Sequence, residues 1–527
     1  MNRRGLKMVK WRKILQVALI FMLVLSLATE GRAACDKEQP SGSTVELAIL
    51  SINDFHGALT EAGKNPGIAK LGTYIMEEKR KNPEGTLVLS AGDMFQGSPE
   101  SNMMHGKTVV EAMNEIGFDA MVVGNHEFDW GVETLKRQIA QSGFPYLGAN
   151  VLDKRTRKQV KFLKPYVILK KNGIRVAVIG IATPETAYKS APKVVGDFIF
   201  ADPAKTVREL VPALRKKAEV IVVLSHLGCE ADEKTGEIRG EAADFARAIQ
   251  GVDLIITGHS HQRIVGKVNE IPLVQAGEYG RTVGKVNFTY SAAAKGITFS
   301  ITSLTDLPTP GLLANPRLAE LLEQAQGEIA PLKNTVLGRT PWELSHDRSR
   351  LSLLGQWSAD VMRTAVKADI AFLNGGGLRT SIQAGEITVG KMYEVMPFDN
   401  TLYVVELSGK QVVEILQHGI KNPKVGMLQF SGLQVHYDAA MPEGERITAT
   451  MADGTPLVLD RLYRVVTNDF MAAGGDEYNT FKEGKNGFDT HIPLREELMK
   501  ALKKQQLLRY EGDNRFTEAG TAYKKAA

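Results

Sequence analysis

The sequence contains little cysteine and no repeated segment. Its two cysteines, Cys35 and Cys229, are too few for a disulfide framework, and a chain of 527 residues can build its core without one. No internal repeat or low-complexity tract is present, while 43% of the residues are hydrophobic and 24% are charged. This composition excludes a fibre or a disordered chain and indicates a globular protein with two or three domains.

An excess of positive charge is also absent once the N-terminus is set aside. The formal net charge of the chain is +5, but residues 1–34 carry seven Lys and Arg against one Glu, a net of +6. The rest of the chain therefore has a net charge of about −1, from +5 minus +6. The sequence gives no argument for binding a nucleic-acid polymer.

The N-terminal residues are typical of a secretory leader. Six Lys and Arg within residues 1–13 precede an uncharged apolar stretch at 14–29 that ends in small residues. This order predicts a signal peptide over residues 1–34, with cleavage after Ala28 or near Ala34. The predicted location is therefore outside the cytoplasm, in a periplasm or at the cell surface.

Two alternatives would keep the protein on a membrane. The apolar stretch is only slightly shorter than a membrane span and could remain as an anchor. Cys35 could carry a lipid, although Arg32 stands where a lipoprotein signal favours an aliphatic residue. Membrane contact is expected only through this leader or a lipid anchor, and both a monomer and a dimer are compatible with the sequence.

Short apolar runs alternate with amphipathic stretches between residues 45 and 302. The runs are rich in Val, Ile and Leu, and read VELAILSI, TLVLS, AMVVG, RVAVIGIA, EVIVVLSH and VDLIITGH. Because these runs are apolar on both faces, they predict buried strands of an α/β fold or a layered mixed sheet.

A Pro- and Thr-rich segment at 304–313, followed by a helical pattern from Pro316, indicates a domain boundary. The prediction is a first domain at 44–305, a linker with a connecting helix at 306–336, a second domain at 337–510 and a polar tail at 511–527.

Metal-ligating side chains follow several of the apolar runs. Because the carboxyl ends of strands are where ligands collect in open sheets, we expect these side chains to form one site. Five of the ten histidines occur in the motifs after these runs, with His126 in GNHE as the one that is not a predicted ligand. The other five, His105, His346, His418, His436 and His491, lack such surroundings and are predicted to be structural. The predicted ligands are Asp54 and His56 in DFHG, Asp93 in AGD, Asn125 in GNHE, His226 in SHLG, and His259 and His261 in GHSH.

The types of these side chains indicate two metal ions. Asp54 and His56 are two positions apart and can point to the same side of an extended segment, and the Asp93 carboxylate can bridge two ions. Two divalent ions with two carboxylates and a bridging hydroxide leave a formally cationic site that suits a phosphate dianion. The mixture of imidazole, carboxylate and amide favours manganese, zinc, cobalt or iron over calcium or magnesium.

A second group of signals lies beyond residue 337. The turn NGGGLR contains Asn374, Gly376 and Arg379, so that the backbone could approach a ligand closely and the arginine could reach an anion. Phe398 in MPFDN and Phe470 in NDFMAAGGDEY are two aromatic residues that could either stack on a ligand or pack in the core.

The motifs DFHG, GD, GNHEFD, SHLG and GHSH, in this order, resemble the calcineurin-like metallophosphoesterase superfamily. Within it they are similar to the bacterial 5′-nucleotidase and UDP-sugar hydrolase branch, over about residues 45–510. The resemblance implies an N-terminal β-sandwich flanked by helices, a connecting helix that permits rotation, and a separate α/β substrate-binding domain.

The resemblance also implies roles for individual residues. One metal ion would be held by Asp54, His56, Asp93 and His261, and the other by Asp93, Asn125, His226 and His259. Several nucleotidases have Gln at the position of His261. His126 would stabilise the phosphoryl group while Asp129 orients its ring. The implied substrate ligands are Arg348 (or Arg350 under a small alignment shift), Asn374, Gly376 and Arg379 for polar groups, Phe398 and Phe470 for the base, and Asp476 for the ribose.

The resulting prediction is a metal-dependent hydrolase of nucleoside 5′-monophosphates, with UDP-sugars or other nucleotides as further substrates. The alternatives on the same framework are a 2′,3′-cyclic-nucleotide phosphodiesterase, a nucleotide pyrophosphatase and a thiosulfohydrolase. From another class, a nucleotide-binding protein without catalysis is the remaining alternative.

Overall fold

A computed structural model describes residues 44–190, 192–232, 234–307 and 311–519. The predicted leader and Cys35 lie outside this part. The chain divides into two units, residues 1–44 with 291–296, and residues 45–290 with 297–527. Of the first unit only Thr44 and residues 291–296 are described, and they include the ends of three strands. Everything below concerns the second unit.

Two six-stranded sheets carry most of the predicted apolar runs. Strands β1 to β4 are mutually parallel in the first sheet, and β7, β9, β12 and β14 are parallel in the second. The first sheet has the order β16 (Gly296–Asp306), β15 (Thr282–Ser291), β1 (Thr44–Ile52), β2 (Thr86–Ser90), β3 (Ala120–Val122) and β4 (Tyr146–Leu147). The second has the order β13 (Arg263–Val268), β14 (Ile271–Ala276), β12 (Leu254–Thr257), β9 (Val220–Ser225), β7 (Ile174–Ile181) and β6 (Tyr166–Lys171).

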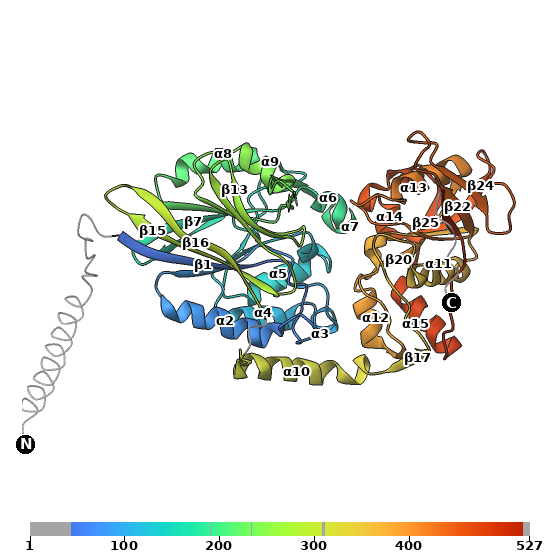
Figure 1. Cartoon of the computed structure of the whole chain (residues 1–527), viewed down its shortest axis with the longest axis horizontal. Helices are drawn as coiled ribbons and strands as arrows, with labels where there is room; N and C mark the ends of the chain where they lie inside the picture. The colour runs from blue at the N-terminus through green and yellow to red at the C-terminus, as the bar shows by residue number, and fades with distance from the viewer. Residues whose placement is uncertain (1–43, 191, 233, 308–310, 520–527) are drawn as a thin grey trace, which may run out of the picture. The chain divides into compact units, whose positions relative to one another are not determined.

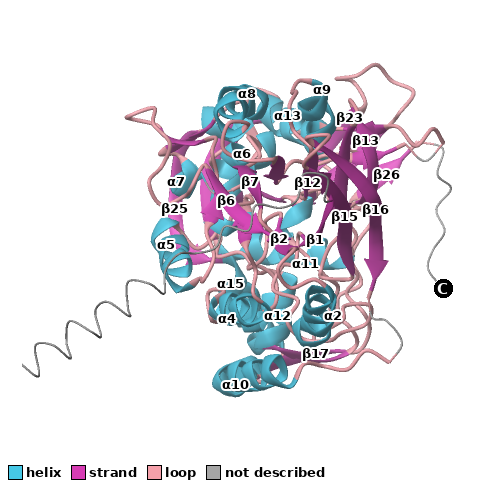
Figure 2. Ribbon diagram, turned by 90° about the vertical axis from the view of Figure 1, so that its left-hand side faces the viewer, coloured by secondary structure: helices cyan, strands magenta, loops and turns pink. Residues whose placement is uncertain are grey.

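Alternate side chains of each strand face opposite layers. Leu47 and Ile49 of β1 pack in one cluster with Val222 of the second sheet, so this cluster forms the core between the sheets. Leu50 and Ile52 belong to a different cluster, which includes residues of helices α2 (Gly67–Lys81) and α4 (Lys107–Ile116). Helices α8 (Pro203–Leu214) and α9 (Glu241–Arg247) cover the other sheet in the same way (Figures 1 and 2).

The helix expected after the Pro-rich segment is α10 (Pro316–Lys333). Its first turn is capped by the Asn315 side chain, which accepts the Leu318 N–H at 3.1 Å, and Pro316 occupies the first position, where no N–H is needed. No helix in the described part of the chain is both long and apolar enough to cross a membrane.

The C-terminal part is built on a five-stranded mixed sheet with helices on both faces. Ala371 and Leu373 of its strand β18 face a cluster with Trp357, and Ile370 and Phe372 face another. The strand order is β21 (Gln429–Ser431), β18 (Ile370–Leu373), β24 (Leu462–Asn468), β20 (Thr401–Ser408) and β25 (Lys485–Pro493). The main helices are α11 (Leu353–Ala365), α12 (Val389–Val395), α13 (Gly409–Gly419) and α15 (Leu494–Gln505). The predicted α/β class, with a sandwich and a further α/β domain, is confirmed.

The segment expected to be a polar tail differs from the prediction over residues 511–519. Strand β26 (Phe516–Glu518) pairs in parallel with β22 (Leu433–Tyr437). Arg515 is only 7% exposed and donates to Asp360 Oδ1 at 2.8 Å and to the Phe430 carbonyl at 2.9 Å. The segment is polar in composition, but Arg515 is paired with groups of the fold and β26 belongs to a sheet. The prediction of a polar tail was therefore wrong for residues 511–519.

Replacing Arg515 by Ala should destabilise the protein, because the partly buried Asp360 carboxylate loses its cation. We expect a loss of about 3 kcal/mol in the free energy of unfolding, measured by urea titration with circular dichroism. Arg339→Ala is the matched control, since Arg339 and Glu386 form an exposed ion pair worth about 0–1 kcal/mol. Equal stability losses in the two variants would contradict the buried network.

Candidate functional site

The predicted ligands follow five parallel strands drawn from both sheets of the sandwich. Asp54 comes after β1, Asp93 after β2 and Asn125 after β3, all in the first sheet. His226 directly follows β9 and His259 follows β12 in the second sheet. Because the carboxyl ends of these strands meet at one edge of the sandwich, segments up to 205 residues apart come into contact, as between His259 N–H and Asp54 Oδ2 at 2.9 Å.

The first possible metal group consists of Asp54, His56 and His261, whose ligand atoms lie within 4.8 Å of one another. The Nε2 atoms of the two imidazoles are 3.1 Å apart, and His261 Nε2 is 3.5 Å from Asp54 Oδ1. Two imidazole nitrogens and a carboxylate that converge in this way can coordinate one cation together.

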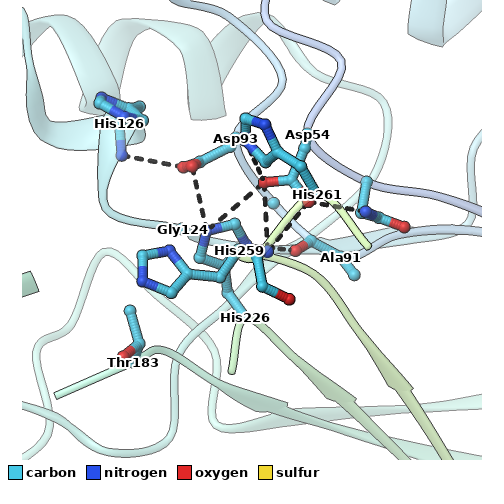
Figure 3. A network of polar contacts seen from close by, with 12 residues as sticks. Asp54, Ala91, Asp93, Gly124, His126, Thr183, His226, His259 and His261 are labelled. Carbon is cyan, nitrogen blue, oxygen red and sulfur yellow. Dashed lines mark hydrogen bonds and ion pairs between the residues drawn. The ribbon is translucent and has the colours of Figure 1, made fainter. Parts of the chain in front are cut away.

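The second possible group consists of Asp93, His226 and His259. His226 Nε2 lies 3.0 Å from Asp93 Oδ2 and 4.0 Å from Asp54 Oδ1, which places the two groups side by side (Figure 3). Asp93 and Asp54 thus both approach His226 Nε2, and the bridging role expected for the Asp93 carboxylate stays a prediction.

Hydrogen bonds fix the orientation of the imidazoles. His56 Nδ1 donates to the Gln96 carbonyl at 2.9 Å, and His226 Nδ1 donates to the Ala91 carbonyl at 2.6 Å. His261 Nδ1 lies 2.7 Å from Glu278 Oε2. In each ring the Nε2 atom is left to bind a ligand, which is the usual arrangement of metal-binding histidines.

The side-chain oxygen of Asn125 tests whether these residues could hold a metal ion. Its side-chain Oδ1 is buried and has no hydrogen-bond partner among the described residues. A buried acceptor without a partner is costly, and a bound cation would satisfy it. Together with the imidazoles and carboxylates, this oxygen fits a pair of divalent ions of the borderline type.

The backbone is strained at the same positions. Asp54, His56, Asp93, His259 and His261 all have positive φ angles, between 48° and 80°. This conformation costs a residue with a side chain about 1–3 kcal/mol, so it persists only where the surrounding fold enforces it. Five of the seven predicted ligands share this strain, which is the pattern expected of a functional site.

A glycine and a glutamate hold the Asp93 loop in place. A Cβ on Gly124 would lie 2.3 Å from Asp93 Oδ1, so only glycine lets the two segments approach this closely. Glu127 accepts the backbone N–H groups of Asp93, Met94 and Gly124 at 2.6–2.9 Å. Burial and the nearby Asp93 raise the pKa of Glu127 to about 7. Glu127 was missed in the sequence, although its place directly after His126 in GNHE was the available signal.

His126 and Asp129 form the predicted pair. His126 Nδ1 is 2.7 Å from Asp129 Oδ2. The backbone N–H of His126 donates to Asp93 Oδ1 at 2.9 Å (Figure 3). Burial alone would lower the pKa of His126, but the Asp129 and Asp93 carboxylates outweigh it and raise this pKa above its usual value. The ring can therefore present a proton on Nε2 while Asp129 fixes its orientation.

A pocket of about 730 Å³ joins this region to the C-terminal part of the chain. It is lined by most of the predicted site residues, and the exceptions are Asp54, His56 and His226. The predicted residues that line it are Asp93, Asn125, His126, Asp129, His259, His261, Arg348, Asn374, Gly376, Arg379, Phe398, Phe470 and Asp476.

Two arginines supply positive charge to the pocket. Among the described residues, neither Arg348 nor Arg379 has a carboxylate within ion-pair distance, so both can receive an anionic ligand. The Arg379 guanidinium lies 6.0 Å from the centre of the Phe398 ring, which in turn lies 5.9 Å from the His126 ring. Arg350 is 77% exposed and pairs with Asp347, so the structure favours Arg348 over Arg350.

Asp476 is held from several directions. Its Oδ2 accepts a hydrogen bond from Asn374 Nδ2 at 2.9 Å, and its Oδ1 lies 3.1 Å from Lys189 Nζ of helix α6 (Thr186–Lys189). His418 Nε2 contacts the Asp476 carbonyl at 2.8 Å, where the backbone has a φ of 52°. Lys189 was missed because it belongs to no motif, and His418 has the structural role predicted for it.

Comparisons with known proteins show which families and structures this chain is similar to. Residues 329–483 match the family of the 5′-nucleotidase C-terminal domain, and residues 81–266 match that of the bacterial capsule synthesis protein PGA_cap. A crystal structure of a 5′-nucleotidase precursor from Thermus thermophilus is similar with a TM-score of 0.79 and 30% identity, over 91% of this chain and 100% of that one.

Two curated relatives cover most of this chain. The trifunctional nucleotide phosphoesterase protein YfkN of Bacillus subtilis (strain 168) is 32% identical over an alignment of 509 residues, which covers 86% of this chain but 33% of YfkN. The chain thus spans a third of the length of that relative. The protein UshA of Yersinia enterocolitica is 29% identical over 485 residues, 82% of this chain and 86% of UshA. Because a solved 5′-nucleotidase precursor is matched over its whole length at 30% identity, the resemblance inferred from the motifs is confirmed, and the chain belongs to the 5′-nucleotidase family.

Proposed function

We propose that this protein is an exported dimetal phosphohydrolase that releases phosphate from nucleoside 5′-monophosphates. The observation that carries the proposal is the pocket in which Asp93, a member of one of two neighbouring possible metal groups, lies beside His126 and shares the lining with Arg348 and Arg379. Export rests on the basic and apolar N-terminus of the sequence.

The proposed metal ligands form the part of the pocket where the reacting water would be activated. Two divalent ions of manganese, zinc, cobalt or iron, when bound, would lower the pKa of a water and neutralise phosphoryl oxygens. The Nδ1 contacts of His56, His226 and His261 hold their rings so that Nε2 serves as the donor. The proposed ligands are Asp54, His56, Asp93 and His261 for one ion, and Asp93, Asn125, His226 and His259 for the other.

The phosphoryl group would meet the cationic side chains of the pocket. His126, whose pKa is raised by Asp129 and Asp93 against the effect of burial, donates a hydrogen bond to an equatorial oxygen as charge develops there. Arg348 and Arg379 bind the remaining oxygens and restrict the phosphate to one orientation.

The nucleoside would occupy the other end of the pocket. Phe398 and Phe470 offer aromatic faces to the base, and stacking tolerates every base because each presents a π face. Asp476, oriented by Asn374, accepts hydrogen bonds from the ribose hydroxyls. Because the two ends of the pocket belong to sequence regions on either side of α10, rotation about this helix would admit substrate and release product.

The alternatives receive less support from the pocket. Two phenylalanines and a ribose-binding carboxylate serve a nucleotide better than a thiosulfate-bearing substrate. A binding protein without catalysis would not need the His126–Asp129 pair at 2.7 Å. UDP-sugars and cyclic nucleotides share the nucleoside end and remain within the proposed substrate class.

Phosphate release from AMP tests the function directly. The purified protein should release phosphate from AMP when manganese is added and should lose this activity in EDTA. A colorimetric phosphate assay measures the release. No release from AMP together with cleavage of p-nitrophenyl phosphate would move the substrate to another ester, and no release from either would contradict the hydrolase.

Replacing Asp93 by Ala should remove metal binding and turnover together, because one carboxylate serves both groups. Metal content by mass spectrometry and phosphate release measure the two effects. Asp153→Ala is the control, since Asp153 accepts the Thr156 N–H in an exposed turn outside the pocket. A variant at Asp93 that keeps both metals and near-normal turnover would refute the site.

Replacing both Phe398 and Phe470 by Ala should weaken AMP binding and spare p-nitrophenyl phosphate, which has no nucleobase. Each lost stacking contact costs about 1–3 kcal/mol, so KM for AMP should rise by at least about tenfold. Phe488→Ala, which removes a 47%-exposed phenylalanine outside the pocket, should leave both substrates unchanged. Equal losses on both substrates would show that the two rings only pack in the core.

A further inference from the structure

The Gln96 side chain is buried, and no group among the described residues pairs with either end of its amide. It lies three residues beyond Asp93, is 1% exposed and lines the pocket together with Asn125 and His126. Within the described part of the chain, neither its Oε1 nor its Nε2 makes a hydrogen bond. Each unsatisfied buried group costs about 1–3 kcal/mol, so a partner from outside the chain is expected to fill this position.

The position of this amide is fixed by its own backbone and by its neighbours. The Gln96 carbonyl accepts His56 Nδ1 at 2.9 Å, which ties the residue to a proposed metal ligand. The next residue, Gly97, donates its N–H to Asn102 Oδ1 at 2.8 Å, and a Cβ there would lie 2.0 Å from the His56 carbonyl. The loop therefore cannot shift to give the amide a protein partner, and the side chain is pre-organised for a ligand.

The chemistry of the surroundings identifies the ligand class. The pocket that Gln96 lines also contains the Arg379 guanidinium, the His126 imidazole and members of both possible metal groups. A neutral amide adds two N–H donors and one acceptor without cancelling that charge. A phosphoryl group with a water nearby uses both functions, since its oxygens accept and the water donates.

We propose that Gln96 is a substrate-binding residue at the phosphoryl end of the pocket. Its Nε2 donates to a non-bridging phosphoryl oxygen, and its Oε1 accepts a hydrogen bond from the attacking water. The assignment rests on the proposed phosphohydrolase function and adds a neutral donor to the side chains that stabilise charge on phosphorus. Because the contact is made to the phosphoryl group, it serves every phosphate ester in the same way.

Gln96→Leu tests the role, with Gln96→Glu as a second variant that keeps the size and one acceptor but loses the donors and adds negative charge. Both should lower kcat by about 100- to 1000-fold, the usual effect of removing one preorganised donor. The loss should be equal for AMP and p-nitrophenyl phosphate, and inhibition by inorganic phosphate should weaken. Metal content and the thermal midpoint should stay at the wild-type values.

Gln138→Leu is the matched control. Gln138 is also buried, its Oε1 also lacks a partner among the described residues, and its Nε2 donates to the His105 carbonyl, but it does not line the pocket. This variant can lose stability, yet it should keep its kcat and its inhibition by phosphate.

The wild-type protein is assayed first. Failure to hydrolyse either ester overturns the proposed function, and with it the substrate assigned to Gln96. With an active wild type, unchanged kcat and phosphate inhibition in both Gln96 variants overturn the assignment alone. Loss of metal in parallel with activity also overturns it, because Gln96 would then support the metal site instead of the substrate.

Discussion

The Asp93 carboxylate is the group on which the rest of the site depends. Its Oδ1 accepts the His126 N–H, its Oδ2 lies 3.0 Å from His226, and its own N–H is held by Glu127. Burying so many titratable groups together is unfavourable unless cations compensate them. The same compensation by bound cations would satisfy Asn125 Oδ1, which is buried without a hydrogen-bond partner among the described residues.

This requirement also accounts for the strain in the backbone. A strand that ended in an ordinary turn would direct its polar side chains along the sheet edge, whereas positive φ angles at Asp54, Asp93 and His259 turn the chain sharply as it leaves each strand. The two packed sheets enforce these turns because the strands themselves are anchored in the core between the sheets. The stability of the apolar sandwich thereby offsets the strain of the ligands held at one edge.

Residues that act through local patterns could be predicted from the sequence. The apolar runs indicated the strands of the sandwich, since burial on both faces leaves an unbroken Val, Ile and Leu signal, and the motifs after them indicated the metal groups. Contacts between residues that only the tertiary structure brings together could not be predicted in this way. Glu278 reaches His261 and Lys189 reaches Asp476 only through the tertiary structure, the latter across 287 residues. The prediction for Arg515 was wrong because a charged residue in a polar segment is usually exposed. In this fold Arg515 is buried and paired with Asp360.

The two ends of the pocket place different demands on the protein. At the phosphoryl end, metal ligands, His126 and Gln96 belong to loops locked by backbone hydrogen bonds, so a small displacement would affect every substrate alike. At the proposed nucleoside end, two aromatic rings and the Asp476 carboxylate would contact groups that vary between nucleotides. Lys189 connects the two ends, because it extends from the part of the chain that holds the possible metal groups to Asp476. A ribose bound by Asp476, as proposed, would compete with this ion pair, whereas a phosphate ester without a sugar would leave the pair intact, so the pair sets a cost that the sugar hydroxyls must offset.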